Sequence, residues 1–341
     1  MSQPSGVDGR RPAPSAPTRL RLRPTAQSLR FVSTYGTIIA LVAMVVVFTM
    51  LEPDTFATFN NGRNILNDMA IGAIVAGGLT LPLVAGDFDL SIGYVASFAG
   101  LLVIGLMGDG QWPMLLAVPA VMALGALIGV INGIVVSKIG VNAFIATLGT
   151  GTIVVGLNYA YSGGVPLQLT PHAMGFTDLA LGRAFRIPHL VLAMALVLGA
   201  LWLILNRTVQ GQHIKAIGVN SESARRAGIA VDRSRIGTFA IAGFCAATGG
   251  VLMASNLGSG QVAAGDGFML TSFAAAFLGS AALREGQFHI LGTFIGVLTV
   301  AVGNNGLAMI GAPIFMQYLF SGTLLVLAVA LSGLGRRYAR G

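Results

Sequence analysis

The sequence has few charged residues and one cysteine among 341 positions. Only 9% of the residues are Asp, Glu, Lys or Arg, whereas 55% are hydrophobic and the mean hydropathy is +0.80. Soluble domains carry roughly 25% charged residues, so this composition excludes an ordinary soluble fold and predicts a membrane protein. The single Cys245 excludes an intrachain disulfide framework and a cysteine-cluster metal site. We interpret it as a small buried apolar residue.

The sequence also lacks the motifs of common catalytic and cofactor sites. It has no His-Glu-x-x-His, Cys-x-x-Cys or Gly-x-Ser-x-Gly pattern, and neither Lys138 nor Lys215 lies in the Gly-Lys-Ser/Thr context of a phosphate-binding loop. Its four histidines are scattered without ligand spacing. We therefore predict no catalytic residue, no metal site and no cofactor on this chain, and no ATP hydrolysis by the chain alone.

Long apolar runs dominate what is present. Ten of them approach the roughly 20 residues that cross the hydrocarbon core as a helix. They lie at residues 34–51, 65–83, 91–107, 113–137, 142–161, 187–205, 236–257, 268–283, 288–304 and 313–333. The predicted fold is therefore all-α, a polytopic transmembrane bundle of about ten helices within residues 31–335.

Arg and Lys are distributed unevenly between the two sides of this predicted bundle. With ten crossings and the N-terminus inside, all of the 20 basic residues except Arg63, Arg183 and Arg186 fall in cytoplasmic segments. Such an excess marks cytoplasmic loops, so both termini are predicted to lie in the cytoplasm. The net charge of +8 is explained by this orientation, and we predict no nucleic-acid partner.

The two ends of the chain are basic and lack apolar runs. Residues 1–30 are rich in Pro, Ser and Arg, a composition typical of a disordered segment, and are predicted to be a cytoplasmic tail. Residues 336–341 form a second basic tail. The first apolar run has no Ala-x-Ala cleavage pattern after it, so it is predicted to be an uncleaved helix.

A polar, basic stretch, residues 206–235, separates the sixth and seventh runs. Connections of this length are uncommon and usually functional. It contains a run compatible with a short helix, residues 221–227, which is ended by Gly228. We interpret the stretch as a cytoplasmic loop that binds a partner, with a solvated loop as the alternative.

Glycine recurs every four residues in the fourth run, at Gly125, Gly129 and Gly133. Small residues at this spacing let helix backbones approach closely in lipid, where packing holds helices together. We interpret this strip as a packing surface inside the bundle, with a seam to a second copy as the alternative.

Carboxylates interrupt the apolar pattern after Pro82, where Asp87 and Asp89 precede the third run. A charged Asp at the centre of a membrane helix costs about 2.5–3.5 kcal/mol, so such residues face a polar cavity or a partner. Asp89 or Ser91 could alternatively cap the third helix. This region is predicted to be a broken helix that faces a polar cavity, a candidate pathway for a solute.

Amides and hydroxyls mark further candidate pathway positions. Asn142, Thr147 and Asn158 lie along the fifth run, and Asn304 and Asn305 lie near the outer end of the ninth. Such groups without compensating charge suit a neutral polyhydroxylated solute better than an ion, although a threonine can instead bond to its own helix. A further polar pair, Arg284 and Glu285, is interpreted as a solvated surface contact.

Four stretches resemble a known family in their order along the chain. They are residues 86–93, 142–150, 211–229 and 265–293, and the first, Gly-Asp-Phe-Asp-Leu-Ser-Ile-Gly, is similar to the Gly-Gly-Ile-Asp-Leu-Ser-Val-Gly of that family. The chain thus resembles the membrane permeases of bacterial ABC importers for ribose, xylose, galactose and related sugars, a family that extends to branched-chain amino acid permeases.

The resemblance implies an inner-membrane permease subunit that moves a neutral sugar inward. It implies three protein partners: an ATP-binding subunit that carries the ATP and Mg, a periplasmic or lipid-anchored solute-binding protein, and a second permease copy, identical or related. Residues 211–229 would dock on the ATPase, with Ala224 for close approach and Arg225 and Arg226 facing carboxylates. The coupling residues are then Gly211, Gly218, Asn220, Ala224, Arg225, Arg226 and Gly228.

The chain also departs from the family pattern. Related permeases tend to have glycine where this chain has Asp87, Ser280, Glu285 and Phe288, so we expect helix packing near the inner gate to differ. Two alternatives from other classes remain, a facilitator or ion-coupled carrier that uses Asp87 and Asp89, and a non-transporting scaffold. An ABC permease for amino acids is a third.

Overall fold

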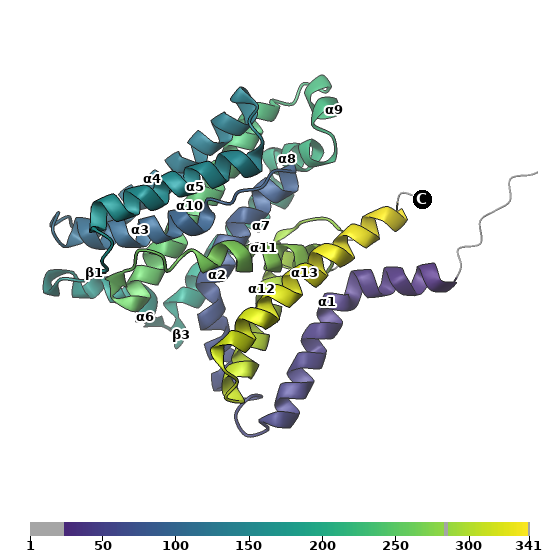
Figure 1. Cartoon of the computed structure of the whole chain (residues 1–341), viewed down its shortest axis with the longest axis horizontal. Coiled ribbons are helices and arrows are strands. Elements are labelled where there is room, and N and C mark those ends of the chain that lie inside the picture. The colour runs from purple at the N-terminus through teal and green to yellow at the C-terminus, as the bar shows by residue number, and fades with distance from the viewer. Residues whose placement is uncertain (1–23, 283–285, 340–341) are drawn as a thin grey trace, which may run out of the picture.

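The computed structural model describes residues 24–282 and 286–339 as a bundle of long helices (Figure 1). The long helices are α1 (Pro24–Leu51), α2 (Phe59–Ala85), α3 (Ile92–Met107), α4 (Met114–Ile134), α5 (Ala143–Ser162), α7 (His189–Arg207), α10 (Val231–Leu257), α11 (Gly267–Ser280), α12 (Ile290–Met309) and α13 (Ile314–Ala339). The predicted all-α polytopic bundle is confirmed.

Short elements connect these helices. They are the π-helical η1 (Val135–Ile139), the 3₁₀-helical η2 (Pro171–Thr177), α6 (Asp178–Leu181), α8 (Val209–Val219), α9 (Ser221–Arg226) and the strands β1 (Leu167–Gln168), β2 (Arg183–Ala184), β3 (Ile187–Pro188) and β4 (Ser259–Gly260). Strand β1 pairs antiparallel with β4, and β2 with β3. These pairs lie at the end of the bundle opposite α9 (Figure 1).

Each predicted apolar run overlaps one long helix over most of its length. Among the described residues, six helices are long and apolar enough to cross a membrane, namely α2, α4 continued by η1, α5, α7, α10 and α12. Helices α3 and α11 and the apolar parts of α1 and α13 are shorter. The number of crossings and the side on which each terminus lies therefore stay predictions.

The helices extend beyond two boundaries drawn from the sequence. Helix α1 begins at Pro24, so residues 24–30, assigned to the tail, are helical, and α13 continues past residue 335 to Ala339. Proline is well tolerated in the first turn of a helix, and no further proline interrupts α1. Residues 1–23 and 340–341 of the predicted tails lie outside the described residues.

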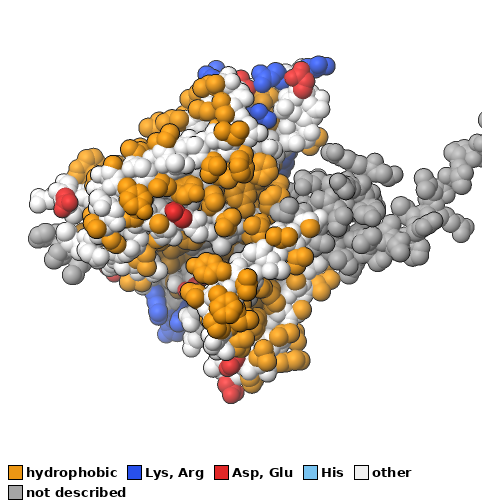
Figure 2. Space-filling view, viewed as in Figure 1, with side chains coloured by type: hydrophobic (Ala, Val, Ile, Leu, Met, Phe, Trp, Pro, Cys, Tyr) orange, Lys and Arg blue, Asp and Glu red, His pale blue; other side chains and the backbone are white. Residues whose placement is uncertain are grey.

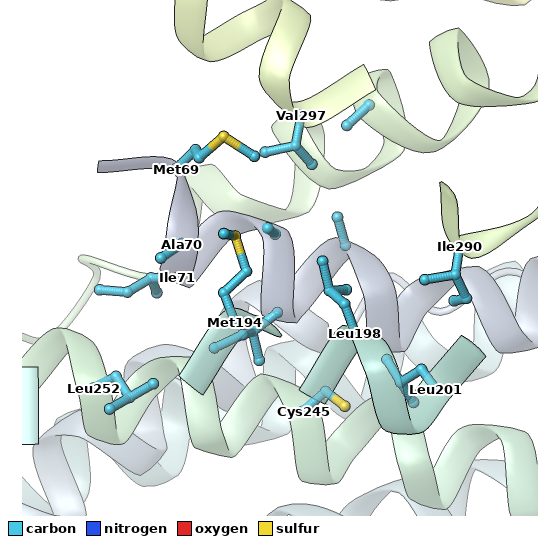
Figure 3. Packing of buried hydrophobic residues seen from close by; sticks show 14 of the residues in the cluster. Met69, Ala70, Ile71, Met194, Leu198, Leu201, Cys245, Leu252, Ile290 and Val297 are labelled. Atoms are coloured by element: carbon cyan, nitrogen blue, oxygen red, sulfur yellow. The ribbon is translucent and has the colours of Figure 1, made fainter. Parts of the chain in front are cut away.

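Helix α2 lies at the centre of the largest apolar cluster. Figure 3 shows side chains from α2, α7, α10 and α12 packed together; those labelled are Met69, Ala70, Ile71, Met194, Leu198, Leu201, Cys245, Leu252, Ile290 and Val297. Cys245 is 1% exposed and contacts α2 at Gly78. Its predicted role as a small buried residue is confirmed.

The glycine strip of α4 lies against α10. A Cβ atom added at Gly129 would lie 2.1 Å from the carbonyl oxygen of Phe239, and one at Gly125 would lie 2.6 Å from that of Gly243. At Gly133 it would lie 2.6 Å from Cα of Ile236. Only glycine allows this backbone contact, so the strip is a packing surface within the chain.

Helices α11 and α12 meet in the same way. A Cβ at Gly279 would lie 2.2 Å from the carbonyl oxygen of Gly292. The adjacent Ser280 is fully buried and donates its hydroxyl to the carbonyl of Phe277 at 2.8 Å, and the ring of Phe288 packs edge-on against Phe277. Both non-glycine residues are thus accommodated without separating α11 from α12. Arg284 and Glu285 lie outside the described residues.

The surface fits a lipid environment. Large apolar side chains are exposed along the outer helices, among them Val42, Leu115, Ile153, Leu196 and Val326. Figure 2 shows hydrophobic side chains spread over the face in view, with Lys and Arg at the end of the molecule that carries α9 and in a second group on the opposite side, near the place of β3 in Figure 1. This distribution is that of a multi-pass membrane protein.

Replacing Gly129 with Ala is expected to destabilise the bundle by about 1–3 kcal/mol, because the added methyl group overlaps the α10 backbone. The matched control is Gly156→Ala in α5, where nothing lies within 4 Å of the added Cβ. The control should be neutral or gain up to about 1 kcal/mol from helix propensity. Melting temperatures of the purified proteins in detergent would compare them, and equal values would contradict the packing role of Gly129.

Candidate functional site

Two carboxylates lie in the connection between α2 and α3. Helix α2 ends at Gly86, whose φ of +89° favours glycine and whose N–H bonds to the carbonyls of Leu83 and Pro82. The chain then runs without regular structure through Asp87 and Asp89 to the start of α3. The break predicted after Pro82 is therefore present, as a connection between two separate helices.

Asp89 is fully buried at the centre of a polar network. Its Oδ1 accepts hydrogen bonds from the N–H of Ser91 at 2.9 Å and from the Ser91 hydroxyl at 2.6 Å. Asn132 of α4 donates its side-chain N–H to the Ser91 Oγ at 2.9 Å, and Thr147 of α5 accepts from the N–H of Leu90 at 3.0 Å. The Ser91 hydroxyl, which Asp89 engages, thus ties the start of α3 to α4, and the Leu90 N–H ties it to α5.

This network changes the predicted role of Ser91. Ser91 occupies the N-cap position of α3 but makes no capping bond with its side chain, because its hydroxyl is engaged by Asp89 and Asn132. The capping interpretation of Ser91 is therefore wrong. Sequence reasoning also missed Asn132, although an amide within the apolar fourth run was a visible signal.

Burial raises the pKa of the Asp89 carboxyl from 3.8 to about 6, while its bonds to Ser91 act in the opposite direction. Its second oxygen, Oδ2, and the Oδ1 of Asn132 are buried without a hydrogen-bond partner among the described residues. A buried acceptor left in this way costs about 1–3 kcal/mol. The connection therefore holds its charge at a cost in stability.

Asp87 forms an ion pair with the start of α10. Nε of Arg235 lies 3.2 Å from Oδ2 of Asp87, within ion-pair distance but without hydrogen-bond geometry. The side chain of Asp87 is 9% exposed and that of Arg235 is 25% exposed. Burial raises the pKa of Asp87, and the neighbouring arginine partly offsets this. The pair joins the α2–α3 connection to the segment that follows α9.

The polar stretch at 206–235 is mostly helical. The predicted short helix is present as α9, capped by Asn220, which accepts from the N–H of Ser223 at 2.9 Å, and followed by Gly228 with φ +84°. Helix α8 was not predicted, because its mixed sequence has no clear apolar period. It begins at Thr208, whose hydroxyl accepts from the N–H of Gly211 at 3.1 Å.

Two glycines allow α8 to pack closely against the membrane helices. A Cβ at Gly211 would lie 2.3 Å from the carbonyl oxygen of Ile204 in α7, and one at Gly218 would lie 1.9 Å from that of Val84 in α2. Neither position can take a larger side chain without moving α8. Gly211 and Gly218 therefore pack α8 against α7 and α2 of the same chain.

The exposed face of α9 differs from the one predicted. Ala224 is 5% exposed and packs with Ile217 and Val231, so it cannot provide close approach to a partner. Arg225 pairs with Asp232 at 3.0 Å and Arg226 with Glu222 at 3.2 Å, and both arginines stay exposed. The surface open to a partner includes these arginines and, at the end of α8, Val219, which is 88% exposed.

A cavity of about 330 Å³ lies where these parts converge. Asp87 from the α2–α3 connection, Lys215 and Val219 from α8, and His289 before α12 belong to its wall. His289 caps α12 through its Nδ1, which accepts from the N–H of Gly292 at 2.9 Å. Segments far apart in the sequence therefore meet at this end of the bundle.

A second cavity lies between α2, α11, α12 and α13 and has a volume of about 340 Å³. It contains Asn304 and Asn305, and Asn305 accepts a hydrogen bond from Asn61 at 3.0 Å. The polar residues of its wall are Asp68, Thr271, Ser272, Asn304, Asn305 and Gln317. Sequence reasoning missed Asp68, Thr271 and Ser272, whose proximity to the ninth run depends on how the helices pack.

Two candidate pathway residues, Asn142 and Asn158, do not belong to the wall of either cavity. Asn142 is exposed and caps α5, accepting from the N–H of Phe144 at 2.9 Å. Asn158 is buried and donates to the carbonyl of Val262 at 2.7 Å, which ties α5 to the connection before α11. Within the described residues, no group of three or more His, Cys, Asp or Glu side chains could hold a metal ion.

Comparisons with known proteins agree over most of the chain. The sequence model of the family described as "Branched-chain amino acid transport system / permease component" matches residues 62–329. The ribose import permease protein RbsC of Escherichia coli (strain K12) is 35% identical over 294 residues, which are 86% of this chain and 91% of that protein.

Other relatives have different printed substrates. The galactose/methyl galactoside import permease protein MglC of the same strain is 30% identical over 331 residues, 92% of this chain and 97% of that protein. The D-allose transport system permease protein AlsC of that strain is 31% identical over 304 residues, 89% of this chain and 93% of that protein. No solved structure matches the chain significantly.

Substitutions at Asp89 should separate its hydrogen bonds from its charge. Asp89→Asn keeps an acceptor for Ser91, whereas Asp89→Leu leaves the Ser91 N–H and hydroxyl buried without their partner, so only the leucine variant should lose about 1–3 kcal/mol or more. The measurement is the melting temperature in detergent at pH 7.5.

The melting temperatures of the parent and of Asp89→Asn should depend on pH in different ways. Because the folded pKa of about 6 lies above the ordinary 3.8, this group stabilises the parent most below pH 4, and that stability is lost as the pH rises through 6. The asparagine variant lacks this loss. Its melting temperature relative to the parent should therefore rise between pH 4.5 and 7.5, and a constant difference would contradict the assignment.

Proposed function

This chain belongs to the family of branched-chain amino acid transport system permease components, and we propose that it is the membrane-spanning permease of an ABC importer for a neutral sugar. The observation that carries the proposal is the family match over residues 62–329. The importer works inward across the bacterial cytoplasmic membrane. ATP and Mg bind a separate ATPase subunit, a solute-binding protein delivers the sugar, and a second permease copy completes the membrane part.

The choice of a sugar over an amino acid rests on charge. The relatives compared above are named for ribose, galactose or methyl galactoside, and allose, all neutral and polyhydroxylated. An amino acid carries a carboxylate that normally requires a cationic or multi-donor partner. The cavity between α2, α11, α12 and α13 has one carboxylate and several hydroxyl and amide groups, and the described residues of its wall include no Lys or Arg. This chemistry suits a sugar better.

The contact with the ATPase is proposed to be the exposed face of α9 together with the end of α8. Arg225 and Arg226 are the positive groups there, and Val219 supplies an apolar contact. Their present ion pairs with Asp232 and Glu222 are exposed, and such pairs contribute about 0–1 kcal/mol. Carboxylates on a partner can therefore replace them at little cost.

The packing of α8 against α2 could transmit movement from this contact to the membrane helices. Gly218 lies against the end of α2 at Val84, and Arg235, after α9, pairs with Asp87. A displacement of α8 and α9 by the ATPase would therefore move the α2–α3 connection. From there the Asp89 network leads to α4 and α5. The proposed role of the buried carboxylates is this mechanical link.

The purified chain is expected to hydrolyse no ATP, and proteoliposomes that contain it should take up sugar only when the ATPase subunit, the binding protein and ATP are supplied. Radiolabelled uptake with each component omitted in turn would measure this. A proton or sodium gradient without ATP serves as the control condition. Uptake driven by either gradient through this chain alone would instead establish the ion-coupled carrier.

Gly228→Val should weaken coupling, because φ +84° at this position costs a β-branched residue roughly 1–2 kcal/mol or more. Gly228→Asn is the matched control, since asparagine tolerates the left-handed region better than other non-glycine residues. Nothing lies within 4 Å of an added Cβ here, so a loss from Val reports backbone strain. Co-purification of the ATPase and ATP-dependent uptake are the measurements. Parental values for Gly228→Val would contradict the coupling role of α9.

A further inference from the structure

The cavity between α2, α11, α12 and α13 has the size of a site for a small solute. Its volume of about 340 Å³ lies at the lower end of the 300–1,000 Å³ found for ligand pockets. It lies near the N-terminal end of α2 and the C-terminal end of α12, the ends predicted to face outward. Met69 and Val297, which meet in Figure 3, form part of its apolar wall.

Two buried polar groups in this wall lack a partner. Ser272 is 2% exposed, and its Oγ makes no hydrogen bond among the described residues; the same holds for the buried Oδ1 of Asn304. Buried polar atoms are almost always hydrogen-bonded in folded proteins. Two such atoms on one cavity therefore indicate a place for a molecule that supplies hydrogen bonds.

The remaining polar groups define the chemistry of that molecule. Asp68 is an exposed residue whose carboxylate is an acceptor only. The amides of Asn304 and Gln317 both donate and accept, and Ser272 can do either. Asn305 has its Oδ1 engaged by Asn61, so it offers its N–H₂ group. Sugar hydroxyls, which donate and accept at once, satisfy this mixed set, and a hydroxyl that donates to a carboxylate forms the stronger, charge-assisted type of bond.

We propose that this cavity is a binding site for the transported monosaccharide within the permease itself, with sugar hydroxyls donating to Asp68 and bonding to Ser272 and Asn304. The site is distinct from the sugar site of the solute-binding protein. That the occupant is the transported solute rests on the proposed function, whereas the binding of a neutral polyol here stands on the cavity alone.

Thiol protection tests the site without requiring transport. Ala308 belongs to the cavity wall and is exposed, so Ala308→Cys should react with a hydrophilic maleimide in reconstituted protein. The native Cys245 is 1% exposed and should stay unlabelled. D-ribose, D-galactose and D-allose, each up to 100 mM, are the probes. At least one should slow the labelling of Ala308→Cys, and none should slow that of Ala57→Cys in the exposed α1–α2 connection.

A charge-neutral variant then tests the carboxylate. In the Ala308→Cys background, Asp68→Asn should raise the sugar concentration needed for half-protection by about fivefold or more, because Asn keeps an acceptor but replaces a charge-assisted hydrogen bond with a weaker neutral one. Asp54→Asn, the same change at another exposed residue that lies outside the cavity, should leave it unchanged. Equal protection in parent and Asp68→Asn would overturn the role of the carboxylate.

The outcomes separate this proposal from the proposed function. If the complete importer takes up sugar but none of the three sugars protects Ala308→Cys, the cavity is not the site and the importer stands. If a sugar protects but uptake needs no ATPase, the cavity stands and the importer fails. Protection by sodium ions alone, with no effect of any sugar, would assign a cation site and overturn the proposal.

Discussion

The structure depends on backbone contact around α10. Glycines let this helix approach its neighbours closely: Gly129 of α4 lies against its backbone, Gly78 of α2 lies against its small side chain Cys245, and its own Gly250 lies against the carbonyl of Ala96 in α3. In lipid no hydrophobic effect drives helices together, so close van der Waals contact must hold them. Because α10 contacts three helices in this way, the positions of these helices depend on one another. They in turn fix the positions of the site residues at both ends of the bundle.

Polar residues gather where the helical hydrogen bonding is interrupted. Between α2 and α3 the backbone needs partners that an unbroken helix would not, and Asp89 and Thr147 accept from its N–H groups, while Asn132 bonds to the Ser91 hydroxyl. Backbone of this kind is tolerated at membrane depth only where protein or water surrounds it. The same break brings Asp87 to Arg235, so the segment that carries α9 is tied to the least regular part of the bundle.

The two ends of the bundle carry different chemistry. The end with α8 and α9 presents paired charges on a short helix held by glycines, an arrangement suited to a protein partner that pushes or pulls. The cavity between α2, α11, α12 and α13 has one carboxylate with amides and hydroxyls, an arrangement suited to a small neutral molecule. Helix α2 joins them, since Asp68 lies near its start and Val84, beneath Gly218, near its end. It is the direct physical connection between solute and energy source proposed here.

The amino-acid sequence alone determined the features that depend on neighbours along the chain. Apolar runs located all ten long helices, four-residue spacing identified the glycine strip, and Gly228 marked the end of α9, because these signals act within one helix or turn. Tertiary structure alone decided that Asp87 pairs with Arg235, that Ala224 faces inward, that Ser91 serves a network instead of a cap, and that Asp68 and Ser272 share a cavity with Asn304. Each of these depends on which face of one helix meets another, and helical periodicity is weak in helices that are apolar on every side.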